Sequence, residues 1–471
     1  MLADIAWRGF SFAYGVFNFA AMAVIAITRD GALTDRMSQD EKKELALAQK
    51  KYWDVDGSPF AGFRHAFYTA RNNVQLHYVT NAAPGTKSNK VIIFIHGFPD
   101  SYVLWRDILT SDALSSYTLI AVDLPGFGGS DSLPHYGPDT VLESMAGFTL
   151  GIREEFLAEG GKLVMVTHDW GGIVGARLAS EAKELADRYI IAGAIVPRQV
   201  HSTITTHIAS ASQMLRTWIR SPFNTRLLRS ALKTLSPFFG QIARSFYIFI
   251  LQLPFPIAHR FTTFGNFWFL RVLHLVQAHV ITAKGKSSRT LTPAQKADYL
   301  AISSGPGAEQ FPRGEKLRQA YGASVQKRIS DFGLSHKIRM YRDHVLLGTW
   351  EKSLQLVIDL SALPPSPHRS GSGAGLFEDG PEGALKVPAT VIYGRKDMAF
   401  DPSAIQNGVG DYLVKGSQCL VVDDAGHWMQ FEEAGSRILT TAALWAVGDE
   451  GTRLRDEIEK TGYGVKWIAE K

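Results

Sequence analysis

The sequence predicts an α/β protein with a largely parallel sheet, and three observations support this fold class. Beyond about residue 60, short β-rich runs alternate with longer helical patterns, as they do in βαβ units. The later runs, such as VIIFI (91–95) and TLIAV (118–122), are almost continuously apolar, which suits strands buried on both faces. A chain of 471 residues that is 45% hydrophobic can bury the core that such a sheet needs.

Eight strands are expected, and the first two form an antiparallel hairpin. The runs are AFYTA near residue 66, VQLHYVT near 74, VIIFI (91–95), TLIAV (118–122), KLVMVTH (162–168), YIIAGAIV (189–196), ATVIY (389–393) and QCLVV (418–422). The insertion after the sixth run is rich in aromatic and basic helical patterns, and SALPPSPHRSGSGAGLFEDGPEG indicates a flexible linker near its end. The expected divisions are a hydrophobic segment (1–30), a first core part (31–196), a helical lid (197–360), the linker (361–386) and a second core part (387–471).

The N-terminal run GFSFAYGVFNFAAMAVIAIT, from Gly9 to Thr28, contains no charged residue and is long enough to cross the hydrocarbon layer as one helix. We expect a membrane anchor, with a helix packed on the protein as the first alternative. A cleaved secretory signal is the second alternative, although the sequence has neither an Asn-x-Ser/Thr sequon nor a pair of cysteines. More basic residues follow the run than precede it, which places the body on the cytosolic side, for example of the endoplasmic reticulum. A soluble cytoplasmic protein is the alternative localisation.

The charge balance and the cysteine content exclude several classes of function. The formal net charge is +5, and acidic residues are interleaved through almost all of the chain. No block of like charge stands out, so nucleic acid is not an expected partner. The single cysteine, Cys419, excludes an internal disulfide and is interpreted as a buried strand residue. Neither a cofactor nor a metal site is expected.

The stretch VMVTHDWGGIVG (164–175) places Asp169 between an apolar strand and a turn of small residues that opens a helix. This is the context of a nucleophile elbow, in which small neighbours let the turn tighten and expose the central side chain. Asp169 stands at the nucleophile position. Taken alone, HDWGG would be better explained by an aspartate that caps the following helix.

Three further segments favour the nucleophile. IHGFPDS follows the apolar run VIIFI. In proteins with a nucleophile elbow, the loop at this position supplies one backbone N–H of an oxyanion hole, and the residue after the nucleophile supplies the other. In this sequence the two N–H groups would be those of Phe98 and Trp170. The Phe98–Pro99 bond is a candidate for the cis form. VIYGRKDMAF places Asp397 after a strand and a turn, where the acid that orients a catalytic histidine is expected. DDAGHWMQFEE places His427 in the loop after the last expected strand.

The motifs HGFPDS, DLPGFGGSD, HDWGG, YGRKD and GHWMQFE together resemble the signatures of the α/β-hydrolase fold epoxide hydrolases, over roughly residues 60–445. The resemblance implies the α/β-hydrolase fold, with helices on both faces of the sheet and a lid inserted after the sixth strand. In the same motifs, Asp123 is interpreted as a carboxylate that fixes its loop, and His96 as a side chain that orients its own loop.

The type of nucleophile limits the reaction. A serine that opened an epoxide would form an ether, which has no carbonyl for water to attack, whereas a carboxylate forms an ester that water can hydrolyse. A carboxylate with a pKa near 4 is ionised at neutral pH and needs no base to activate it. His427 is therefore free to activate water for the second step, while Asp397 holds the ring and stabilises the imidazolium. The amides of Phe98 and Trp170 would stabilise the oxyanion.

Opening an epoxide also requires a proton donor, and a phenol remains protonated at neutral pH. Epoxide hydrolases have two such tyrosines on the lid. By this resemblance, SFYIFILQLP matches the first lid motif with Tyr247, and RMYRDH matches the second with Tyr341. Tyr321 in RQAYGAS is the reserve candidate, and packing of the lid is the alternative role for each tyrosine.

Three other functions remain open. Haloalkane dehalogenases share much of this arrangement and need halide donors, for which Trp170 and either Trp218 or Trp268 are the candidates. A cyclase would open the epoxide with an internal hydroxyl, and a non-catalytic receptor could use the same scaffold. Aromatic residues in the lid favour a lipophilic epoxide, such as a terpenoid, polyketide or fatty-acid derivative, as the substrate. These residues are Phe246, Phe249, Phe255, Phe261, Phe264, Phe267 and Trp268.

Overall fold

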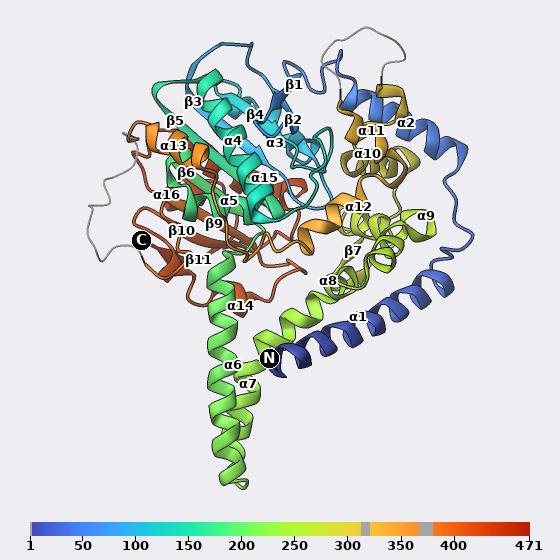
Figure 1. Ribbon diagram of the computed structural model, residues 1–471, viewed down its shortest axis with the longest axis vertical. Helices are drawn as coiled ribbons and strands as arrows, with labels where there is room; N and C mark the ends of the chain where they lie inside the picture. Colours follow the sequence, from blue (N-terminus) through green and yellow to red (C-terminus); the bar gives the residue numbers. More distant parts are fainter. Residues whose placement is uncertain (1, 312–320, 367–379) are drawn as a thin grey trace.

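The computed structural model describes residues 2–311, 321–366 and 380–471, and a nine-stranded sheet with helices on both faces forms its centre (Figure 1). The strands are β1 (Arg64–Thr69), β2 (Gln75–Thr80), β3 (Ser88–Ile95), β4 (Thr118–Val122), β5 (Leu157–His168), β6 (Arg188–Ala192), β9 (Ala389–Gly394), β10 (Gln418–Val422) and β11 (Val465–Glu470). Their order in the sheet is β1-β2-β4-β3-β5-β6-β9-β10-β11. All pairs from β4 to β10 are parallel, whereas β1–β2, β2–β4 and β10–β11 are antiparallel.

Two expectations about the strands are wrong. The sheet has nine strands rather than eight, because β11 pairs with β10 at the edge of the sheet. The side chains of β11 are half-buried or exposed, so this strand lacks the apolar run that marks the central strands. The sixth strand ends at Ala192 rather than at residue 196, because Gly193 turns the chain with a φ of 52° and a helix begins at Pro197.

The central strands are buried on both faces, as their apolar runs predict. On β3, Ile93 and Ile95 belong to the hydrophobic cluster that includes α4 (Pro138–Phe156) and α5 (Trp170–Glu181). Ile92 and Phe94 belong to the cluster on the other face, which includes α15 (Glu433–Val447). Each such side chain contributes about 1.5–3 kcal/mol when it is fully buried. The shorter helices that complete the body are α3 (Arg106–Leu109), α14 (Pro402–Gln406) and α16 (Leu454–Glu459).

The region inserted after β6 is mainly helical. Its elements are α6 (Pro197–Arg220), α7 (Thr225–Arg244), α8 (Phe246–Leu251), α9 (Phe255–Gln277), α10 (Pro293–Ser304), α11 (Ala323–Lys327), α12 (Leu334–Lys337) and α13 (Leu354–Ala362), with a short hairpin of β7 (Ile281–Thr282) and β8 (Gly285–Lys286). α13 packs against α4, and therefore lies on the body of the protein. Much of the expected linker, residues 367–379, lies outside the described residues.

The two N-terminal helices both pack against the inserted region. α2 (Gln39–Trp53) begins with a capping box in which Ser38 and Glu41 exchange hydrogen bonds, and its Trp53 indole donates to the Ala301 carbonyl of α10 at 3.0 Å. α1 (Leu2–Thr28) runs along the outside of α8 (Figure 1), and within it Ile5–Thr28 is long and apolar enough to cross a membrane. The helix therefore combines two expected alternatives: it has the composition of an anchor, and it packs on the protein.

Gly15 allows α1 to approach α8 closely. A Cβ atom at Gly15 would lie 2.6 Å from the Phe249 carbonyl oxygen, whereas a Cβ at Gly9, in the same helix, would have no neighbour within 4 Å. Gly15→Ala is therefore expected to push α1 away from α8, at a cost of about 1–3 kcal/mol for overpacking. Limited proteolysis of residues 29–38 should become several-fold faster in Gly15→Ala and should not change in Gly9→Ala. Equal cleavage rates in the two variants would contradict this role of Gly15.

Candidate functional site

Asp169 lies at the turn between β5 and α5, in a strained backbone conformation. Its φ of 51° and ψ of −119° are unfavourable for a residue with a side chain, and such strain is concentrated at functional sites. The turn needs small residues: a Cβ at Gly171 would lie 2.4 Å from the carbonyl oxygens of Ile95 and His96, and one at Gly172 would lie 2.3 Å from Ala194. The sequence thus forms a tight strand–turn–helix connection, with Asp169 at its centre.

The loops after three other parallel strands bring partners to this carboxylate. The Phe98 backbone N–H, after β3, donates to Asp169 Oδ1 at 2.7 Å. His427, after β10, places Nε2 3.6 Å from Asp169 Oδ2, and its Nδ1 lies 2.9 Å from Oδ2 of Asp397, after β9. The Phe98–Pro99 peptide bond is cis, as expected. The structure therefore brings together the predicted nucleophile, histidine, acid and first oxyanion donor, and Trp170 opens α5 next to them.

Buried charges in this cluster compensate one another. Burial raises the pKa of the Asp169 carboxyl, but the neighbouring His427 and the Phe98 N–H outweigh burial and hold that pKa below its ordinary value. Burial lowers the pKa of His427, but the carboxylates of Asp397 and Asp169 outweigh it and raise that pKa above its ordinary value. At neutral pH the site therefore holds an ionised Asp169 beside a positively charged imidazole.

The two predicted tyrosines lie beside each other, near the Asp169 carboxylate. Tyr247 belongs to α8, and Tyr341 ends a 3₁₀ turn (Ile338–Tyr341). Their ring centroids are 5.9 Å apart, and the Tyr341 ring stands edge-on to the Trp170 ring at 4.7 Å. Burial raises the pKa of both phenols, so both are protonated at neutral pH. Tyr321 lies outside this group, because its hydroxyl donates to the Trp53 carbonyl at 2.9 Å.

A cavity of about 620 Å³ joins these side chains. Asp169, His427, Tyr247 and Tyr341 all line it, and the rest of its wall is largely apolar. The apolar lining residues include Met22, Phe98, Phe246, Trp268, Phe269, Val272, Leu273, Val276 and Trp428. A larger groove of about 1270 Å³ runs between α4 and α13, but no predicted site residue lines it. The smaller cavity is therefore the candidate site.

Two residues of the expected motifs have the supporting roles assigned to them. The Asp123 carboxylate, after β4, accepts hydrogen bonds from the backbone N–H groups of Tyr102 at 2.7 Å and Gly129 at 2.8 Å. It also lies 2.8 Å from Nδ1 of His77. His96 Nε2 accepts from the backbone N–H of Leu124 at 3.0 Å. Both side chains therefore fix loops around the site and do not reach the cavity.

A polar cluster beneath the Phe98 loop was not predicted. The Asp100 carboxylate accepts from the side chains of Gln277, at 2.7 Å, and Trp428, at 2.9 Å. The buried Lys337 donates to the Pro99 carbonyl at 3.0 Å. Asp100 and Trp428 stand in the motifs HGFPDS and GHWMQFE, which could have drawn attention to them, whereas nothing in the sequence marks Lys337 or Gln277. This cluster holds the loop that carries Phe98 against the inserted region.

Other contributions to the site were also missed by sequence reasoning. Met22 lines the cavity although it belongs to α1, far from every motif in the sequence.

Among the residues that the structure describes, no group of three or more His, Cys, Asp or Glu side chains could hold a metal ion.

The chain is similar to known proteins in sequence and in structure. A family model described as alpha/beta hydrolase fold matches residues 90–434. The chain is similar to an epoxide hydrolase 3 of Xenopus tropicalis, with 28% identity over 148 residues, which make up 31% of this chain and 38% of that protein. It is similar to an epoxide hydrolase 3 of Mus musculus, with 22% identity over 377 residues, or 78% of this chain and 74% of that protein. A solved structure of a Bacillus megaterium epoxide hydrolase in complex with an inhibitor has a TM-score of 0.47 and 17% identity, and the match covers 81% of this chain and 99% of that one.

The bonds of Asp123 give a test of its structural role. Asp123→Ala leaves buried N–H groups without an acceptor, so the free energy of unfolding should fall by about 3–5 kcal/mol. Urea unfolding followed by circular dichroism measures this change. Asp112→Ala, which removes an exposed carboxylate in the same part of the chain, should change stability by less than about 0.5 kcal/mol. Unchanged stability of Asp123→Ala would show that the loop does not depend on this carboxylate.

Proposed function

Because the chain belongs to the α/β-hydrolase fold family, we propose that it is an epoxide hydrolase that converts a lipophilic epoxide to a vicinal diol through Asp169. One observation carries this proposal: an ionised carboxylate and two protonated phenols face the same apolar cavity. The carboxylate can attack an epoxide carbon while a phenol protonates the departing oxygen. The relatives that are named epoxide hydrolases support the same activity.

In the first step, an Asp169 carboxylate oxygen forms a bond to an epoxide carbon, and the bond from that carbon to the ring oxygen breaks. The ring oxygen takes a proton from Tyr247 or Tyr341, which leaves a phenolate. The product of this step is an alkyl ester of Asp169. General acid catalysis of this kind contributes about 10²–10⁴-fold to the rate.

In the second step, His427 removes a proton from a water molecule that attacks the ester carbonyl. Esterification removes the negative charge of Asp169, which is one of the two carboxylates that raise the pKa of His427. The pKa of His427 therefore falls when the ester forms, its proton passes to the phenolate that the first step leaves, and the neutral imidazole becomes a base when one is needed. The Phe98 N–H, already 2.7 Å from Oδ1, and the Trp170 N–H stabilise the oxyanion by about 3 kcal/mol per donor. Collapse of the tetrahedral intermediate breaks the ester C–O bond, the departing alkoxide takes the remaining proton of the attacking water to give the diol, and the ionised Asp169 is regenerated beside the imidazolium.

The apolar lining and α1 favour a substrate that partitions into membranes. Met22 contributes to the cavity wall, while the other face of α1 exposes Phe12, Phe17 and Val24 to solvent. We therefore propose that α1 attaches the protein to a membrane, with the catalytic body on the cytosolic side. Within the expected lid (197–360), α8 and α9 line the cavity and would cover it, whereas α13 lies on the body.

Haloalkane dehalogenation is the second candidate, and the hydrogen bonds of the indoles disfavour it. A halide site needs free N–H donors, but Trp268 Nε1 donates to Asp30 at 3.0 Å, and Trp218 Nε1 donates to the Pro222 carbonyl at 3.0 Å. The Trp170 side chain interacts with the Tyr341 hydroxyl. These indoles are therefore engaged, whereas the two phenols line the cavity and favour an epoxide as the substrate.

The ester intermediate can be trapped. His427→Gln removes the base of the second step, so kcat should fall by about 10³-fold or more and an alkylated Asp169 peptide should accumulate, as mass spectrometry would detect. In the unsubstituted protein, one turnover in oxygen-18 water should give a diol whose new oxygen is unlabelled, because it comes from Asp169. His201→Gln, which changes an exposed histidine, is the control and should behave as the unsubstituted protein does.

Three outcomes would overturn the proposed mechanism or activity. Direct entry of the label into the diol, without an adduct, would mean that Asp169 is not the nucleophile. A cyclic ether as the product would identify a cyclase. A lack of turnover on all epoxides would favour a dehalogenase or a receptor.

The tyrosine pair gives a separate test of the first step. Tyr247→Phe and Tyr341→Phe should each slow formation of the ester by about 10–100-fold, and the double variant by about 10³-fold or more, because no proton donor remains. Rapid-quench measurement of the adduct in the His427→Gln background isolates this step. Tyr321→Phe is the matched control, since it removes a buried hydroxyl outside the cavity and should leave the rate unchanged. An undiminished rate in the double variant would exclude the tyrosines as the proton donors.

A further inference from the structure

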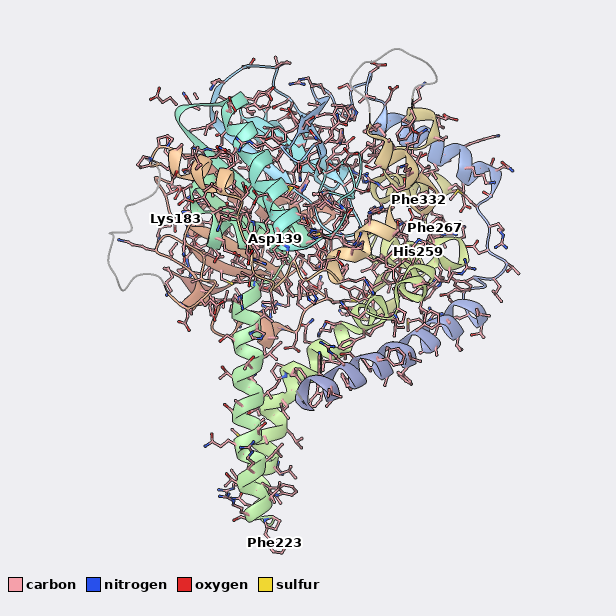
Figure 2. The ribbon with its side chains drawn as sticks, in the orientation of Figure 1. Asp139, Lys183, Phe223, His259, Phe267 and Phe332 are labelled. Atoms are coloured by element: carbon pink, nitrogen blue, oxygen red, sulfur yellow. The ribbon has the colours of Figure 1, made fainter. Side chains whose placement is uncertain are left out.

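The helices α6 and α7 form an antiparallel hairpin that projects away from the body of the protein (Figure 1). We name residues 197–244 the α6–α7 hairpin. α6 has 24 residues and is therefore about 36 Å long. Figure 2 shows Phe223 at the far tip, in the loop between the two helices. No catalytic step described above needs a projection of this length.

The α6–α7 hairpin exposes large apolar side chains, most strongly at its tip. Phe223 is 98% exposed and Ile219 is 71% exposed, while Leu232 and Phe239 on α7 are more than half exposed. The apolar residues of both helices recur at helical spacing, but packing between the helices covers only part of these stripes. A face of this kind marks a surface that binds a partner.

The charge of this region identifies the chemistry of the partner. The expectation that acidic residues are interleaved through almost all of the chain is wrong for residues 188–297, which contain Lys and Arg but no Asp or Glu. Five basic side chains of the α6–α7 hairpin are exposed, and within the described part of the chain none of them makes an ion pair. They are Arg216, Arg220, Arg226, Arg229 and Lys233. Aromatic and aliphatic side chains flanked by unpaired cations suit the boundary between anionic headgroups and acyl chains.

The α6–α7 hairpin is continuous with the exposed face of α1. The Trp7 ring of α1 lies 6.3 Å from the Phe238 ring of α7, near the base of the hairpin. From this point, α1 runs along the body with an exposed apolar outer face, and Gly15 holds its inner face on α8. Two apolar surfaces therefore meet on the same side of the molecule.

We infer that the α6–α7 hairpin is a lipid-binding element, which inserts the apolar tip around Phe223 into the surface of an anionic bilayer. α1 then lies along the membrane surface beside it, rather than crossing the bilayer as an isolated span. This inference extends the proposed membrane association through α1 and does not depend on the epoxide chemistry. Lipid binding is measured directly, so a failure of either proposal leaves the other intact.

A fluorescent label at the tip tests insertion in the full chain. The native cysteine, Cys419, is buried, so Phe223→Cys introduces an accessible thiol for a nitrobenzoxadiazole fluorophore. Vesicles of phosphatidylcholine with about 30% phosphatidylserine should raise the emission, shift it to shorter wavelength and make it sensitive to a lipid-borne quencher. The same label at Lys183→Cys, an exposed site on the body away from the hairpin (Figure 2), should not respond.

Removal of charge tests whether anionic lipid is the occupant. Each basic side chain near an anionic surface changes partitioning by about fivefold, so Arg220→Ala with Arg226→Ala should weaken vesicle binding by about 25-fold. Lys183→Ala with Lys415→Ala removes the same charge from exposed sites on the body and should have little effect.

Three results would overturn the inference. The first is unchanged fluorescence of the label at residue 223 when the chain is bound to vesicles through α1. The second is an equal response to vesicles of pure phosphatidylcholine, since anionic lipid would then play no part. The third is a response of the label to protein concentration without lipid, which would identify a second copy of the chain as the occupant.

Discussion

The site depends on the groups that compensate the buried negative charge of the Asp169 carboxylate. An unpaired ion in a protein interior costs several kcal/mol, so Asp169 can be buried only where donors already stand around it. The parallel sheet provides these positions, because β3, β5, β9 and β10 all end at the same edge. Their loops deliver the Phe98 N–H, Asp169 itself, Asp397 and His427 to one point. For the assembly of the site, the order of these strands in the chain therefore matters less than the fact that their carboxyl ends point in the same direction.

The need for hydrogen-bond donors around Asp169 also links the inserted region to the site. The loop that offers the Phe98 N–H is held from below by Asp100 and Lys337, and Asp100 in turn binds Gln277 of α9. A shift of α9 or α12 would thus move the Phe98 N–H as well as the cavity wall. The 3₁₀ turn that ends in Tyr341 follows α12 directly, so the segment that anchors the loop also carries the proposed proton donor Tyr341. Contacts between segments that are remote in sequence therefore position Tyr341, the Phe98 loop and the cavity wall together.

This division between local and remote contacts explains what the sequence could predict. The elbow around Asp169 and the loops of Asp397 and His427 could be found because each is a short motif beside an apolar strand. Tyr247 and Tyr341 were located by resemblance alone, since nothing local separates them from packing residues. β11 escaped prediction because its side chains are only partly buried, and its strand state depends on pairing with β10. Met22 and Lys337 escaped because packing between distant segments determines their roles.

The position of Met22 connects membrane attachment with access to the cavity. A lipophilic substrate is concentrated in the bilayer, and transfer of its apolar surface back into water costs about 25 cal/mol per Å². α1 presents one apolar face to the outside and contributes Met22 to the cavity wall, so little more than the width of one helix separates the two environments. If α1 lies along the membrane surface, a substrate can pass from lipid to Asp169 without being fully exposed to water. On this argument, the N-terminal helix is part of the substrate path as well as a means of attachment.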